Sequence, residues 1–169
     1  MPTLRLEKTM RHLVACLAVF LSAAAFADDA LQPTAWTEKA QPLETIEKVS
    51  LPAVDVEALK AEDAQHAASG LKDQRYAATH KVNISPDTTG TWERVGADRL
   101  LWRVRVQSVG ALSLNFGFDE FFMPPGGRLF IYAAKGTHVY RPFTADDNED
   151  HGQLWTPPVF GDETVLEVT

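Results

Sequence analysis

Alternation of apolar and polar side chains along two neighbouring stretches limits the fold of this chain more than any other feature. The alternating apolar residues are Trp102, Val104 and Val106, followed by Leu112, Leu114, Phe116 and Phe118. A period of two is typical of a strand that turns one face toward a core. We therefore expect two strands with these side chains inward. The short segment 108–111 would join them as a hairpin.

Further short strands are expected on both sides of this pair. They cover residues 76–84, 92–95, 128–132, 138–143 and 164–168. The run 124–127, Pro-Pro-Gly-Gly, and the glycine at 136 are typical of turns between them. About seven short strands separated by turns predict a mainly-β fold, in the form of an antiparallel, jelly-roll-like β-sandwich over residues 71–169.

The first 27 residues have the three parts of an export signal. Basic residues come first, an apolar run covers 13–21, and Ala25 and Ala27 precede Asp28 in a small-x-small cleavage pattern. This order predicts a Sec-type signal peptide over 1–27 and a secreted or periplasmic protein. The apolar run is shorter than the roughly 20 residues of a spanning helix, so we expect no stable membrane anchor. A lipoprotein signal ending at Cys16 is the alternative, but Cys16 precedes most of the apolar run.

Two segments are expected between the signal and the strands. Residues 28–53 are rich in Pro, Thr, Glu and Gln without a sustained period, which predicts a flexible leader or linker. Residues 54–70 form the one good helix candidate. Asp55 can cap its first turn, Glu57 suits the N-terminal dipole, and Gly70 can end it.

Charge and cysteine content exclude several classes of protein. The net charge of −7 argues against a general nucleic-acid binder, because such proteins need an excess of Lys and Arg. Removal of residues 1–27 takes away three basic residues and one acidic residue, so the mature chain is more acidic still. The single Cys excludes a disulfide framework and a cysteine-based zinc site.

The sequence contains no recognisable active site. Serine-protease nucleophile patterns, H-E-x-x-H and the glycine-rich nucleotide-binding patterns do not occur, so we expect no catalytic residue and no cofactor. His80 and His138 fall on predicted strands without a partner motif.

Two features could bind a ligand. Asp146, Asn148 and Asp150 place oxygens at alternate positions and are weak candidates for calcium. An EF-hand loop counted from Asp146 would need Gly and Glu where His151 and Pro157 stand, so a solvated acidic loop is the simpler interpretation. The four tryptophans could form a sugar-stacking platform, although burial is the usual fate of such side chains. They are Trp36, Trp92, Trp102 and Trp155.

An ordered series of short segments resembles the N-terminal region of bacterial lysyl-endopeptidase-like secreted serine proteases. These segments are 102–106, 110–118, 124–126, 129–132 and 142–157, and the resemblance covers roughly residues 75–168. In that family the region lies between the signal peptide and a trypsin-like domain, and it is removed on maturation. The resemblance therefore implies a propeptide-type domain whose partner is a serine protease domain in cis or in trans. It carries over none of the catalytic His, Asp and Ser, because the chain ends before the corresponding segment.

The sequence ends directly after the predicted strand 164–168, so we expect a fragment truncated within or just after its β-domain. A truncated gene product and a stand-alone relative remain open. The second function class is a secreted binding or adhesion module on a β-sandwich, with cell-surface glycan as its ligand, because sandwiches host both roles. A single exposed face lined by Trp92, Trp155 or Tyr140 would favour that alternative.

Overall fold

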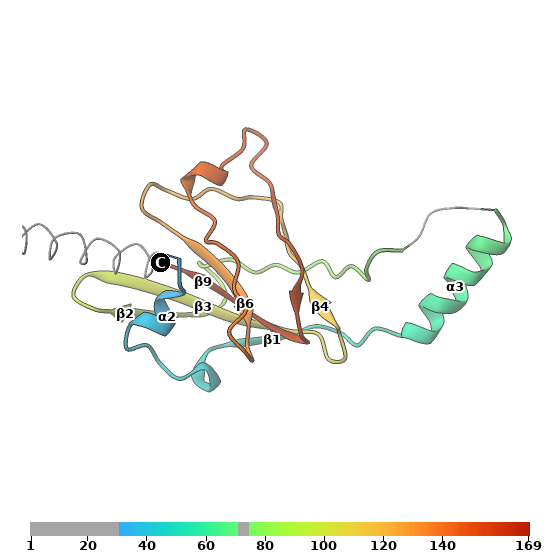
Figure 1. The fold of residues 1–169 in the computed structure, drawn as a ribbon, viewed down its shortest axis with the longest axis horizontal. Coiled ribbons are helices and arrows are strands. Elements are labelled where there is room, and N and C mark those ends of the chain that lie inside the picture. The colour runs from blue at the N-terminus through green and yellow to red at the C-terminus, as the bar shows by residue number, and fades with distance from the viewer. Residues whose placement is uncertain (1–30, 71–74) are drawn as a thin grey trace, which may run out of the picture.

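The fold is mainly β, as the alternating pattern predicted. A computed structural model describes residues 31–70 and 75–169 (Figure 1). The predicted signal peptide and its cleavage residues Ala25, Ala27 and Asp28 lie outside the described residues. In the described part of the chain no helix has the length and apolarity needed to cross a membrane.

A five-stranded sheet forms the centre of the molecule (Figure 1). Its strands are β1 (Lys48–Ser50), β2 (Thr91–Val95), β3 (Arg99–Gln107), β6 (Leu129–Ala133) and β9 (Glu163–Val168). The order is β1-β3-β9-β6, and β2 pairs with the other half of the β3 edge that β1 occupies. All pairings are antiparallel except β1 with β3, which is parallel. This parallel edge departs from the wholly antiparallel arrangement that the sequence predicted.

Two short ribbons accompany the sheet. β4 (Ser113–Leu114) pairs with β8 (Val159–Phe160), and β5 (Gly117–Phe118) pairs with β7 (Leu154–Trp155). Between them the backbone N–H of Thr156 donates to the carbonyl of Phe116 at 2.9 Å, so the two ribbons continue one another.

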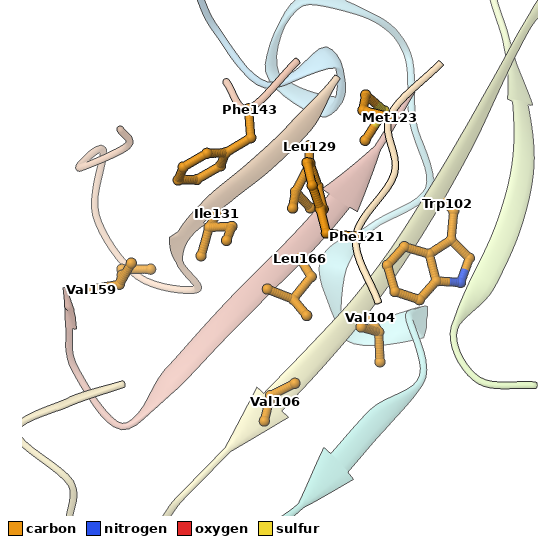
Figure 2. Close-up of a cluster of buried hydrophobic side chains, with 11 residues drawn as sticks. Trp102, Val104, Val106, Phe121, Met123, Leu129, Ile131, Phe143, Val159 and Leu166 are labelled. Carbon is orange, nitrogen blue, oxygen red and sulfur yellow. The ribbon is translucent and has the colours of Figure 1, made fainter. Parts of the chain in front are cut away.

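The main core lies between one face of the sheet and these ribbons (Figure 2). Val104 and Val106 of β3 share this face with Ile131 of β6 and Leu166 of β9, and Val159 of β8 packs onto them. The remaining buried members are Trp102, Phe121, Met123, Leu129, Ala133 and Phe143. Residues 28–169 contain no Cys, so burial of apolar surface and not a disulfide must stabilise this core.

The opposite face of the sheet is covered by a segment that we call the N-terminal strap, residues 33–51. It contains α2 (Thr34–Thr37), the 3-10 turn η1 (Leu43–Thr45) and β1, and Ile46 within it is buried. Leu43 packs on a second buried cluster formed by Phe130, Tyr132 and Val165. The prediction of a flexible linker over 28–53 was therefore wrong for the strap. Its order comes from partners far along the chain, which the local composition does not reveal.

The helix predicted over 54–70 is confirmed as α3 (Val56–Ala68). The Asp55 carboxylate accepts a hydrogen bond from the backbone N–H of Ala58 at 2.9 Å, and Gly70 follows with a φ of 80°. None of its residues is buried, and Figure 1 shows it standing away from the sheet. The thin apolar stripe in the sequence agrees with this position.

Two of the predicted strands, 76–84 and 138–143, do not form. Residues 76–84 form no strand and pair with no other segment of the described structure. Residues 138–143 make only two isolated bridges to β6, through Val139 and Phe143. Four other predicted strands are confirmed as β2, β3, β6 and β9, within one residue at each end except that β3 begins three residues earlier, at Arg99.

The stretch 112–118 is not one inward-facing strand. It divides into β4 and β5, and Leu112 is 88% exposed because it precedes the first of them at the end of the turn. Phe116 and Phe118 do pack on the main core, as expected. The turn at 108–111 exists, with Gly110 at a φ of 82°, but it joins no hairpin. β3 pairs with β9 whereas β4 pairs with β8.

Candidate functional site

The acidic loop that offered calcium candidates is occupied by internal contacts. Asp147 begins this arrangement: both of its oxygens accept hydrogen bonds from the Arg141 guanidinium, at 2.6 and 2.9 Å. The Arg141 bonds, helped by a hydrogen bond from the Thr144 backbone N–H, hold the pKa of Asp147 below its usual range. Thr144 and Asp147 form a capping box on the 3-10 turn η2 (Ala145–Asp147).

The three candidate residues themselves do not gather around a common point. Asn148 uses its carboxamide to hold Met123: the Met123 N–H donates to Oδ1 at 2.8 Å and Nδ2 donates to the Met123 carbonyl at 2.9 Å. Asp146 and Asp150 are exposed. Within residues 31–70 and 75–169, no group of three or more His, Cys, Asp or Glu side chains could hold a metal ion. The loop fastens the segment around Met123 to the ribbon layer.

His80 and His151 lie in different surroundings. His80 is half-buried, with a buried Nε2 that has no hydrogen-bond partner. Nδ1 of His151 accepts a hydrogen bond from the Gln153 backbone N–H at 3.0 Å, beside an open depression. The lining residues of this depression are Asp119, Glu120, Phe121, Phe122, His151 and Gly152. Because it is open and has no serine or cysteine, the depression has no nucleophile of the Ser-His or Cys-His kind.

Each of the two ribbons carries one exposed aromatic side chain on its outer side. Leu154 and Val159 point into the core, so the next residues, Trp155 and Phe160, point outward by the period of a strand. They are 71% and 69% exposed. The ring of His138 lies edge-on near Phe160, with centroids 6.4 Å apart. We call Trp155, Phe160 and His138 the outer aromatic face.

Trp155 lies directly over a glycine. A Cβ placed on Gly117, its cross-strand partner, would come within 2.8 Å of the indole six-membered ring. The backbone of Gly117 therefore supports one side of the indole and leaves the other to solvent. The other two candidates for a sugar platform behave differently. Trp92 donates through Nε1 to the carbonyl of Pro86, and Tyr140 is half-buried with its hydroxyl bound to the carbonyl of Pro158. No ring contact within the described structure joins two of these three side chains.

A buried polar network lies beneath the strap, on the sheet face opposite the ribbons. Glu167 of β9 is fully buried and accepts hydrogen bonds from the Tyr132 hydroxyl at 2.7 Å and from the Ala35 N–H at 3.2 Å. The Trp36 ring meets the Tyr132 ring edge-on at a centroid distance of 5.1 Å. The contacts join β9, β6 and the start of the strap.

A second buried pair continues the network. Arg103 of β3 pairs with Glu93 of β2 and donates at 2.8 Å to the carbonyl of Gln41 in the strap. The Gln41 N–H in turn donates to Glu93 at 2.8 Å. The two charges pair with one another and with strap backbone, although Nε of Arg103 is buried without a hydrogen-bond partner in the described structure.

Burial governs the titration of this network. Loss of hydration raises the pKa of Glu167, while the hydrogen bonds from Tyr132 and from the strap backbone oppose the change. Burial and the adjacent carboxylate raise the pKa of the Tyr132 hydroxyl. A buried acid next to a hydroxyl is a feature of many active sites, but Glu167 has no exposed surface for a substrate. The network is therefore structural, and it fastens the strap.

Sequence reasoning missed this network. Arg103 and Glu167 occupy polar positions of alternating strands, where the expected environment is solvent. No local signal shows that a distant segment covers them.

No protein-family model matches this chain, and no solved structure matches it.

Proposed function

We propose that this chain is a secreted, non-catalytic domain of the propeptide type. Its partner is a serine protease domain, in cis or in trans, whose folding it assists or whose active site it covers until removal. We further propose that the β-domain is an antiparallel β-sandwich of jelly-roll type with one parallel edge strand. Support for this comes from the ribbons, which pack as a second layer on one face of the sheet.

The outer aromatic face is the observation that carries the functional proposal. Trp155 and Phe160 are large and well exposed, and each lies on a ribbon whose other side is anchored in the core. Exposed aromatic groups on a rigid support favour contact with another protein, because burying them releases hydration without ordering a loop. A folding helper needs such a surface to bind a partly folded partner.

The charge around this face supports a basic partner. The chain carries a net charge of −7, and five of its exposed acids lie in the segments that follow β5 and precede β7, at one end of the β5–β7 ribbon. These acids are Asp119, Glu120, Asp146, Glu149 and Asp150. An acidic rim speeds association with a basic surface and lowers affinity for acidic ones.

The test is refolding of a lysyl-endopeptidase-type protease domain with this chain added in trans. We expect a higher yield of active enzyme with the wild-type chain than without it. The double variant Trp155→Ala, Phe160→Ala should lose that gain. The matched control is Tyr76→Ala, which removes an aromatic ring that is 81% exposed but lies outside the ribbons. Equal yields with and without the chain, together with no inhibition of the folded protease, would refute the proposal.

One observation favours a second candidate, a glycan-binding module. The Trp155 indole lies over Gly117 with its other side open, which is a suitable platform for stacking a sugar ring. Titration with oligosaccharides, followed by tryptophan fluorescence, separates the two candidates. Glycan binding would be established if oligosaccharide quenched the tryptophan fluorescence saturably, if Trp155→Ala abolished this quenching, and if the chain had no effect on protease refolding.

A further inference from the structure

A long arm leaves the sheet and returns to it between β1 and β2. It covers residues 52–89, and in its described part no residue is buried. α3 lies within it and stands away from the sheet (Figure 1). Both ends of the arm are fixed at one place, since the Gly90 N–H donates to the Glu47 carboxylate at 2.7 Å. The arm therefore contributes little to the folded body.

The returning part of the arm has the geometry of a protease substrate. Residues 76–84 are extended, and no backbone N–H or C=O among them makes a hydrogen bond within the described structure. Endopeptidases bind their substrates as extended chains, so a segment without backbone hydrogen bonds can enter an active site at small cost. Figure 1 shows it running from α3 back to the sheet.

Lys81 is the basic residue best presented on this segment. Its side chain is exposed, and within the described residues no hydrogen bond or ion pair holds it. The contrast is Arg75, whose guanidinium is engaged by Glu62 at 2.7 Å and Asp63 at 3.1 Å. Val82 and Asn83 after the lysine are exposed, and the chain rejoins the core only at Ile84.

Cutting here would not separate the two halves. The first piece would keep the strap, and the second would keep the sheet to which the strap is bound. Several contacts hold the two pieces together. They are the parallel pairing of β1 with β3, the hydrogen bonds of Glu167 with Ala35 and of Arg103 with Gln41, and the packing of Leu43 on the second core cluster. These contacts do not involve the arm.

We propose that the Lys81–Val82 peptide bond is a proteolytic processing site for an endopeptidase of trypsin-like specificity, and that the cut protein stays one folded unit. Water adds across this amide, which gives a carboxylate on Lys81 and an amine on Val82. The proposal is independent of the function proposed above, because it needs only a protease that accepts a basic residue. Its physical basis is the combination of an unpaired, exposed segment with a strap bound elsewhere.

The test uses the full chain with a trace of trypsin, sampled over time by intact mass. We expect the first new N-terminus to be Val82. Lys81→Gln should remove this product, and so should Val82→Pro, which keeps the lysine but replaces the susceptible amide. The matched control is Lys60→Gln, because the Lys60 side chain is 67% exposed but its backbone is held in α3. It should leave the first cut unchanged.

The cut sample is then passed over a size-exclusion column in native buffer and in urea. We expect the two pieces to elute together in native buffer, at the volume of the uncut chain, and apart in urea. A chain that stays intact, or a first cut elsewhere, would overturn the assignment of the site. Separation of the pieces in native buffer would overturn the claim that the strap holds them.

Discussion

Glu167 gives the sharpest test of how the strap is held. Replacing it by Ala removes the acceptor for two hydrogen bonds and leaves the buried Tyr132 hydroxyl without a partner. Stranding the Tyr132 hydroxyl costs about 1–3 kcal/mol and losing the Ala35 bond to a charged group costs about 1.5–3 kcal/mol, so Glu167→Ala should lower the free energy of unfolding by about 3–6 kcal/mol. Glu167→Gln keeps the shape and one acceptor oxygen, and at pH 7 it should cost less than about 1 kcal/mol.

The sign of the pH dependence follows from burial. Because the pKa of Glu167 is raised in the folded protein, its contribution to stability is complete below its unfolded pKa, near 4.5, and is lost as the pH rises through the folded pKa. The stability of Glu167→Gln relative to wild type should therefore increase from pH 4 to pH 7.

Urea unfolding at several pH values, followed by tryptophan fluorescence, measures both quantities. The reasoning would be refuted if Glu167→Gln were as damaging as Glu167→Ala at pH 7 with no dependence on pH. That result would mean that attraction between ionised Glu167 and Arg103 outweighs the cost of burial.

Three further outcomes are expected. Asp147→Asn should cost about 1 kcal/mol of stability at pH 7, because it removes the ion pair with Arg141 and the cap of η2. Because the pKa of Asp147 is lowered in the folded protein, this cost should disappear as the pH falls below about 3.8. Urea midpoints at pH 3 and pH 7 would show the difference. Phe130→Ala, at a fully buried site, should cost about 3–5 kcal/mol, whereas Phe160→Ala, at an exposed one, should change the thermal midpoint little; equal effects would contradict the assignment of the two faces. Gly90→Ala should cost about 3 kcal/mol by urea titration, since φ is 91° and a Cβ would clash with the buried indole of Trp102. A wild-type midpoint would contradict the geometry of this turn.

The sequence predicted the strands whose burial follows their own alternation. β3 is the clearest case, because Trp102, Val104 and Val106 all lie in the main core. The same rule failed at Leu112, which alternates in step with Leu114 and Phe116 but lies at the end of a turn, before the strand begins. Its place in the alternating pattern therefore did not predict its burial. Local patterns predict which face a residue takes but not where a short ribbon begins.

The strap and its network could not be predicted in the same way. The strap has no period of its own, and its order depends on pairing with residues that follow it by many tens of positions. The outer aromatic face was predicted only in part, since Trp155 was a candidate for exposure but Phe160 was not. The calcium candidates were predicted from their spacing alone. In the structure the Asn148 side chain instead makes two hydrogen bonds with the backbone of Met123.

The position of β9 in the sheet has a consequence for how the chain folds. β9 lies between β3 and β6, and its residue Val168 pairs with Trp102 of β3 on one side and with Leu129 of β6 on the other. The sheet is continuous only once both pairings have formed. Until residues 163–168 are in place, β3 keeps only its pairings with β1 and β2, and β6 has no sheet partner in the described structure. Closing these long loops costs chain entropy before the stabilising contacts of β9 form, and this raises the folding barrier. We therefore expect slow, all-or-none folding, with no stable intermediate made from the first 160 residues alone.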